Sequence, residues 1–164
     1  MVDRSPPTIA RERPDTEDGA RLIAATIAEL AERYGEDQGG PDVDELAAAD
    51  ATFLVARIDG RAVACGAFRE LAPGVVEIKR MYVEPSARRR GLARAILREL
   101  ERLAREAGAE AVRLETGLRQ PEAIALYESE GYQRFECWPP IYSEDPLSVC
   151  FEKRFAQPAQ RASA

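Results

Sequence analysis

Two turn signals divide the middle of the sequence into three apolar runs and limit the folds that the chain can adopt. Asp59-Gly60 stands between the apolar residues 53–58 and 61–68. An Asp-Gly pair in this position predicts a tight hairpin, because both central residues of a type I′ turn need a positive φ. Pro73-Gly74 marks a second turn, and Val75–Val83 follows as a third run. The segment therefore predicts three antiparallel strands in a meander.

The hydrophobic period changes after this meander. Between residues 92 and 107 apolar side chains recur at intervals of three and four, which predicts a helix that Gly108 ends. The other expected elements, in chain order, are a strand at residues 8–13, helices at 20–34 and 43–48, a strand at 111–116, a helix at 121–130, and strands at 132–138 and 148–153. This order predicts an α+β fold with a mixed sheet. We expect one domain over residues 8–155, with flexible tails at 1–7 and 156–164.

Composition excludes several classes of protein. The 164 residues fit one domain, and no stretch is long and apolar enough to span a membrane. Lys and Arg total 23 against 29 Asp and Glu, a net charge of −6 that argues against a nucleic-acid partner. The first residues carry charges and prolines in place of a secretory signal, so we expect a cytoplasmic protein.

Two residue types restrict the chemistry further. The chain has no histidine, which removes His-based triads and His-ligated metals. Cys65, Cys137 and Cys150 are scattered, and their spacing indicates neither a disulfide framework nor a metal site. We expect these cysteines to pack within strands, and we expect no bound metal.

The segment after the third strand carries the strongest functional signal. A strand ends at Val83, a tight turn follows, and a helix begins at Gly91, preceded by three consecutive arginines. The first N–H groups of a helix have no partner within it, so such a turn can bind phosphate. The alternative is a solvated charge run at a helix start, although cations there oppose the helix dipole.

These residues carry a resemblance to a known family. Arg88-x-x-Gly91-x-Ala93 after a strand resembles the pyrophosphate-binding motif of the GNAT acyltransferases. The match continues through Leu114-Glu115-Thr116-Gly117, the segment 123–128 and Gly131-Tyr132. The resemblance covers about residues 8 to 155 and is closest to small bacterial acetyltransferases. It implies a mixed, mostly antiparallel sheet flanked by helices, whose splayed central strands, Val75–Val83 and residues 111–116, form a cleft for acetyl-CoA.

The resemblance also implies which residues hold the cofactor. Backbone groups of the third strand would pair with the pantetheine arm, and the turn with its arginines would hold the phosphates. Gln120 stands where many members of the family carry an asparagine that bonds the same arm. The cofactor-binding residues expected on this basis are Met81, Tyr82, Val83, Arg88, Arg89, Arg90, Gly91, Leu92, Ala93 and Gln120.

Two residues are candidates for catalysis. Tyr127 matches the tyrosine with which the family protonates the departing thiolate, whereas without that context it reads as a packed aromatic. Glu77 lies where some members carry a base for the acceptor amine. A charged residue on an apolar strand must line a cleft or be paired. Glu77 could therefore be that base, or it could simply neutralise Lys79 on the same face of the strand.

The acceptor is the least determined part of the prediction. Residues 138–146 form a long connection between the last two strands, where Trp138 and Tyr142 could bind the substrate. The resemblance implies direct transfer of an acetyl group from acetyl-CoA to a small-molecule amine, and members of the family often form homodimers. The alternatives are a protein or peptide amine as acceptor, or a regulatory module that binds acyl-CoA without turnover.

Overall fold

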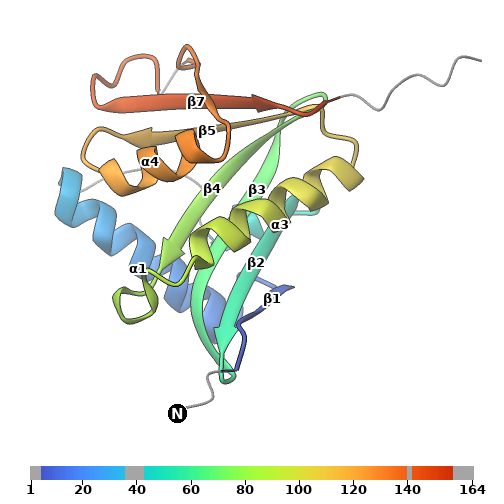
Figure 1. Ribbon diagram of the computed structural model, residues 1–164, viewed down its shortest axis with the longest axis vertical. Helices are drawn as coiled ribbons and strands as arrows, with labels where there is room; N and C mark the ends of the chain where they lie inside the picture. Colours follow the sequence, from blue (N-terminus) through green and yellow to red (C-terminus); the bar gives the residue numbers. More distant parts are fainter. Residues whose placement is uncertain (1–4, 36–42, 140–141, 157–164) are drawn as a thin grey trace, which may run out of the picture.

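A seven-stranded sheet runs through the protein in the order β1-β2-β3-β4-β5-β7-β6 (Figure 1). The structure is a computed structural model that describes residues 5–35, 43–139 and 142–156. Within these residues all neighbouring strands are antiparallel except β4 and β5, which are parallel. The strands are β1 (Thr8–Arg11), β2 (Ala51–Ile58), β3 (Arg61–Ala72), β4 (Val75–Val83), β5 (Ala111–Gly117), β6 (Gln133–Arg134) and β7 (Ser148–Arg154). The helices are α1 (Glu17–Tyr34), α2 (Val43–Leu46), α3 (Leu92–Glu106) and α4 (Pro121–Ser129).

The predicted α+β fold and its meander are confirmed. At the β2–β3 turn Asp59 has a φ of 51° and Gly60 a φ of 81°, the positive values that a type I′ hairpin requires. Helices cover both faces of the meander, and alternate residues of β2 show which helix covers which face. Leu54 and Ala56 belong to the core cluster that contains the buried side of α3, whereas Phe53 and Val55 pack with Leu22 of α1.

The sheet opens in its middle. β4 and β5 pair only from Val75 opposite Ala111 to Ile78 opposite Leu114, although both strands continue further. Figure 1 shows the far ends of β4 and β5 diverging, with α4 beside the gap. The splayed pair that the resemblance implied is therefore present, and its opening starts at Lys79 on β4 and at Glu115 on β5.

A bulge in β4 lies at the start of this opening. Cys65 pairs with Tyr82 and Ala67 with Lys79, so two residues of β4, Arg80 and Met81, stand opposite Gly66 alone. Arg80 has a φ of 55°, and a Cβ on Gly66 would lie 2.6 Å from the Met81 sulfur. The extra residue reverses the alternation of side chains, because Met81 packs on the α3 side and Tyr82 on the α1 side.

Two expectations about the C-terminal region were wrong. The strand predicted at residues 132–138 is reduced to β6, Gln133–Arg134, because after Phe135 the chain leaves the sheet. The second error concerns the cysteines: Cys137 and Cys150 form a disulfide with a Cα–Cα distance of 5.2 Å. Their separation of 13 residues carried no signal in the sequence, because the fold alone brings the end of β6 beside β7. Cys65 is free and buried, as expected.

Other boundaries differ from the predicted ones by a few residues. The expected tails fall largely outside the described residues, and the domain limits 8–155 stay a prediction. No helix within the described residues is both long and apolar enough to cross a membrane.

Candidate active site

A cavity of about 510 Å³ lies between the start of α3, the end of β4 and α4; we call it the α3–α4 cavity. The turn that leads into α3 forms one wall. Gly91 precedes the helix with a φ of 76°, and no side chain caps the first turn. The first N–H groups of α3 therefore have no acceptor within the helix. Gly91 and Ala93, both small, line the cavity beside these donors.

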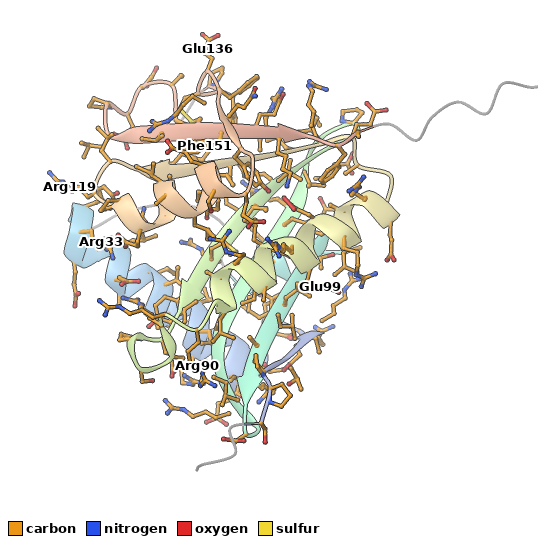
Figure 2. All side chains as sticks on the ribbon, viewed as in Figure 1. Arg33, Arg90, Glu99, Arg119, Glu136 and Phe151 are labelled. Carbon is orange, nitrogen blue, oxygen red and sulfur yellow. A yellow bond between two sulfur atoms is a disulfide. The ribbon has the colours of Figure 1, made fainter. Side chains whose placement is uncertain are left out.

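Arginines surround this cavity, and most of them have protein partners. Arg88 donates to the backbone oxygen of Val83 at 2.9 Å and to Glu29 of α1 at 2.7 Å. Arg33 of α1 pairs with Glu122 of α4 at 2.5 Å. Figure 2 labels Arg33 beside Arg119, and each of these two guanidinium groups donates to the other's backbone oxygen. The end of α1 is thus fastened to the segment before α4.

A second cavity of about 200 Å³ lies on the α1 side of the opened sheet, and we call it the β7-loop cavity. Its walls come from α1, from the separated ends of β4 and β5, and from the segment before β7. Both cavities are lined by Met81, Gln120 and Tyr127, and also by Glu29. The two cavities therefore meet where β4 and β5 part.

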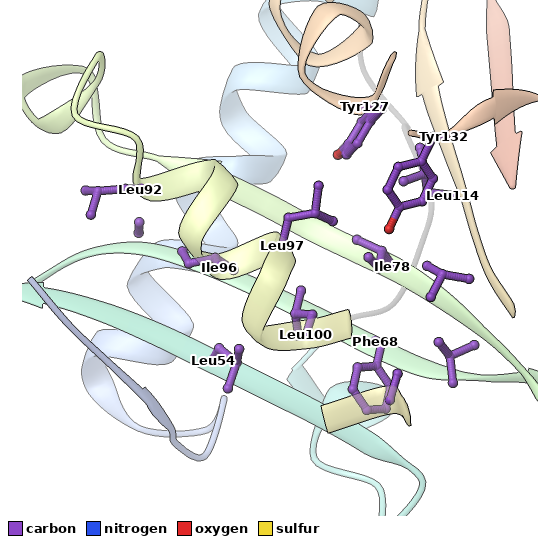
Figure 3. Packing of buried hydrophobic residues seen from close by; sticks show 14 of the residues in the cluster. Leu54, Phe68, Ile78, Leu92, Ile96, Leu97, Leu100, Leu114, Tyr127 and Tyr132 are labelled. Atoms are coloured by element: carbon purple, nitrogen blue, oxygen red, sulfur yellow. The ribbon is translucent and has the colours of Figure 1, made fainter. Parts of the chain in front are cut away.

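Tyr127 stands at this meeting point. It is 5% exposed, and its ring packs edge-on against Tyr132 at a centroid distance of 5.7 Å (Figure 3). Among the described residues its hydroxyl has no hydrogen-bond partner. Burial, reinforced by the charge of Glu115, raises the Tyr127 pKa above its usual value. The phenol therefore stays protonated at neutral pH and is available as a donor to a group in the cavity.

Glu115 lies across the opening from Lys79. Its carboxylate accepts a hydrogen bond from the Ser148 hydroxyl at 2.9 Å, and it lines the β7-loop cavity. Burial raises the pKa of Glu115 to about 7, although Ser148 and the charge of Lys79 act in the opposite direction. A carboxyl group with this pKa exchanges protons near neutral pH, which is the property that a general base needs.

Sequence reasoning passed over Glu115 and singled out Glu77. The same signal, an acidic residue in an apolar strand, is present at both positions. Glu77 is only 1% exposed and lines neither cavity. It lies 3.3 Å from Arg69 and 3.6 Å from Lys79, whose ammonium donates to the Tyr142 hydroxyl. These contacts match the structural one of the two roles that the sequence left open.

Comparisons with known proteins identify the family of this chain. The Acetyltransferase (GNAT) family matches residues 21–132, more than half of the chain. The chain belongs to the GNAT acetyltransferase family. An IAA acetyltransferase of Azospirillum brasilense is 40% identical to it over 148 residues, which cover 89% of this chain and 96% of that protein.

Solved GNAT structures agree with the fold. A protein of Klebsiella pneumoniae assigned as an acyl-CoA N-acyltransferase is 36% identical, with a TM-score of 0.76 over 90% of this chain and 97% of the other. The PaiA N-acetyltransferase of Thermoplasma acidophilum, solved in complex with coenzyme A, has a TM-score of 0.71 at 15% identity. That likeness covers 92% of this chain and all of the other, and it shows the fold alone.

Most of the predicted site residues of this GNAT acetyltransferase come together. All of the residues expected to hold the cofactor line the α3–α4 cavity except Arg90, whereas Arg33 and Arg94 line it and were not expected. Tyr142 lines the β7-loop cavity. Trp138 does not line it, but its ring makes an edge-on contact with the Tyr142 ring at a centroid distance of 5.2 Å.

The environment of Glu77 leads to a stability prediction. Replacing Glu77 by Gln should lower the free energy of unfolding by about 1–3 kcal/mol, because the largely buried charge of Lys79 loses its ion-pair partner and the half-exposed Arg69 loses one of its two. Urea denaturation measures this loss. When the folded variant is saturated with its substrates, its kcat should stay close to the wild-type value. A stable variant with strongly reduced kcat would instead assign the base to Glu77.

Proposed function

We propose that this chain transfers an acetyl group from acetyl-CoA to the amine of a small molecule by direct attack. Acetyl-CoA would occupy the α3–α4 cavity, and the amine would enter the β7-loop cavity. The observation that carries this proposal is the junction of the two cavities at Met81, Gln120 and Tyr127. Two substrates bound on opposite sides of that junction could react without leaving the protein.

The residues around the α3–α4 cavity fit acetyl-CoA. Uncapped N–H groups at the start of α3 suit a pyrophosphate, and the positive end of the helix dipole adds to the attraction. Arg89 lines the cavity and has no ion-pair partner among the described residues, so its charge is available to a phosphate. β4 pairs with β5 only as far as Ile78. Beyond it, backbone groups on that edge of β4 are available to the pantetheine amides.

The size of the β7-loop cavity favours a small acceptor. About 200 Å³ admits a compact amine, and Tyr142, Asp145 and Leu147 of the segment before β7 line part of the cavity. An amine enters mostly as ammonium at neutral pH, so it must lose a proton before it attacks a thioester. We assign Glu115 as the group that accepts this proton, because it lines the cavity and its pKa is raised to about 7.

Tyr127 would act on the other side of the reaction. Its protonated hydroxyl would donate to the sulfur of the departing thiolate, as the family pattern implies. A free thiol has a pKa of about 8.5. Burial in the same cavity would raise the pKa of the thiol in the same direction as it raises that of Tyr127.

An amine panel tests the proposed reaction. Purified protein would be mixed with acetyl-CoA and with tryptamine, spermidine, L-lysine, kanamycin or a peptide with a free N-terminus, and released thiol would be followed together with product mass. Acetylation of a small amine in preference to the peptide supports the proposal. Preference for the peptide would mean that the acceptor is a protein or peptide amine. Binding of acetyl-CoA without any product would indicate a regulatory module.

Gly91 provides a test of the donor site. Replacing Gly91 by Glu should abolish acetyl-CoA binding, since a carboxylate would stand where the phosphates are expected. Gly91→Ala is the matched control, because it has the same backbone strain at a φ of 76° without the charge, and a Cβ there meets no atom within 4 Å. We expect calorimetry to detect binding to the alanine variant only. Unchanged affinity for acetyl-CoA in a folded Gly91→Glu variant would show that the phosphates do not bind at this turn.

A further inference from the structure

The Cys137–Cys150 disulfide closes a ring of chain that contains one wall of the β7-loop cavity. The bond joins the segment after β6 to the middle of β7, and the two cysteines are 13 positions apart in sequence. Four residues of this ring line the β7-loop cavity: Tyr142, Asp145, Leu147 and Ser148. A covalent link far from the α3–α4 cavity thus encloses the side of the site where the acceptor is proposed to bind.

Both ends of the disulfide lie close to residues that we assign to the reaction. Cys150 stands directly opposite Glu115 in the β5–β7 ladder, two residues after the Ser148 that donates to the Glu115 carboxylate. At the other end, Cys137 precedes Trp138. The indole packs edge-on against Tyr142, and the Lys79 ammonium lies 4.6 Å from the centre of the Tyr142 ring.

Noncovalent contacts also hold this wall to the sheet, among them the hydrogen bond from the Lys79 ammonium of β4 to the Tyr142 hydroxyl. Phe135 donates its N–H to the Cys150 oxygen at 3.0 Å, and Leu118 donates to the Leu147 oxygen at 2.9 Å. Between these two points, in the described residues 136–139 and 142–146, one backbone hydrogen bond reaches the sheet, from the Ser148 N–H of β7 to the Asp145 oxygen at 3.1 Å. The disulfide adds a covalent fixed point to these weaker contacts. Without it, the ring would have to be ordered again each time an acceptor binds, which lowers affinity.

We propose that the Cys137–Cys150 disulfide positions the acceptor wall, so that binding of the amine depends on the thiol–disulfide state of the protein and binding of acetyl-CoA does not. This inference rests on the proposed function, in which the β7-loop cavity holds the amine. None of the described residues of the ring lines the α3–α4 cavity, so we expect its affinity for acetyl-CoA to be independent of the bond.

Dithiothreitol is a suitable reductant for testing this dependence. One of its thiolates attacks the sulfur of Cys137, the more accessible partner, since Cys150 is only 2% exposed. A mixed disulfide forms while the Cys150 sulfur leaves and takes up a proton. The second thiol of the reagent then closes its own ring disulfide and releases Cys137 as a thiol. Two electrons and two protons pass from the reagent to the protein.

Thiol titration and kinetics together test the proposal. Denatured without reductant, the protein should expose one thiol per chain, that of Cys65, and after reduction it should expose three. With the amine that the panel identifies, reduction should raise the KM for the amine by about tenfold or more, as expected when a binding wall loses its order. The Kd for acetyl-CoA from calorimetry should stay within about twofold, because the ring does not reach that cavity.

A double variant, Cys137→Ser with Cys150→Ser, is the matched control. It should have the raised KM of the reduced wild-type protein, and dithiothreitol should change nothing further. If the double variant does not fold, the comparison of oxidised and reduced wild-type protein still decides the question. Three thiols in the unreduced protein, or an equal KM for the amine in both states, would overturn the inference. Failure of every amine in both states, with acetyl-CoA still bound, would instead overturn the proposed function.

Discussion

Replacing Glu115 by Gln should lower kcat/KM at pH 7 by about 10²-fold, the effect expected when a positioned general base is lost. The pKa of Glu115 is raised to about 7 by burial, so the wild-type rate should climb as the pH rises through that value and the carboxyl group ionises. In the Gln variant this inflection should disappear, and the rate should rise only as the free amine loses its proton in solution. The pH profile of kcat/KM for both proteins measures the difference.

The same substitution should make the protein more stable at alkaline pH. A raised pKa means that the folded state holds the proton of Glu115 more tightly than the unfolded chain, so the ionised carboxylate destabilises the fold as the pH rises from about 4.5 through about 7. Glu115→Gln should therefore gain about 1–3 kcal/mol at pH 8 and almost nothing at pH 4. Glu144→Gln is a control, because Glu144 is exposed and lines neither cavity.

An unaltered pH profile in the Glu115→Gln variant would exclude Glu115 as the base. Loss of activity together with loss of stability at pH 8 would point to a structural carboxylate. A general base whose ionised form destabilises the fold predicts both results for the Gln variant: a lower rate and a higher stability at pH 8.

Tyr127→Phe should reduce kcat by about 10²-fold while leaving acetyl-CoA affinity and thermal stability nearly unchanged. The ring keeps its contacts with Tyr132 and Phe151, and the hydroxyl has no partner within the described residues whose loss would destabilise the fold. Rapid mixing of the amine with protein that is saturated with acetyl-CoA measures kcat, and calorimetry measures the affinity for acetyl-CoA.

Tyr132→Phe is the matched control for this experiment. Tyr132 is a buried neighbour of Tyr127, but its hydroxyl donates to Glu101 at 3.0 Å and lines neither cavity. Its removal should lower stability by about 1 kcal/mol and leave kcat intact. Equal rates for wild-type protein and Tyr127→Phe would reduce Tyr127 to a packing residue.

Local signals in the sequence were sufficient for the framework of the fold. The Asp59-Gly60 pair fixed the hairpin, because few residue pairs tolerate positive φ at both positions. The strand at Val75–Val83 and the helix after Gly91 followed from periodicity and turn chemistry. The proposed donor site could be predicted for the same reason, since a strand, a turn and a helix start are contiguous in the chain.

The parts that depend on distant contacts were not predictable in the same way. Periodicity assumes an unbroken strand, so it could not place the bulge at Arg80 that sends Met81 toward the α3–α4 cavity. The choice between Glu77 and Glu115 requires knowing where β4 and β5 part, because the carboxylate before the opening becomes buried in ion pairs and the one after it faces the cavity.

The acceptor side of the site also depends on distant contacts. The contact of Trp138 with Tyr142, and the disulfide beside it, arise because β6 is short and the chain leaves the sheet after Phe135. No pattern in residues 132–150 encodes that path, and the register of β7 against β5 had to be known first.

An initial-rate matrix, with thiol release measured while acetyl-CoA and the amine are varied independently, is the most direct test of two cavities that meet at Tyr127. Direct transfer requires both substrates to be bound at once, so reciprocal plots should give lines that intersect. Parallel lines would mean that the acetyl group rests on the protein between two separate half-reactions. That result would contradict the account, because it would need a nucleophile at the junction in place of Glu115 and Tyr127.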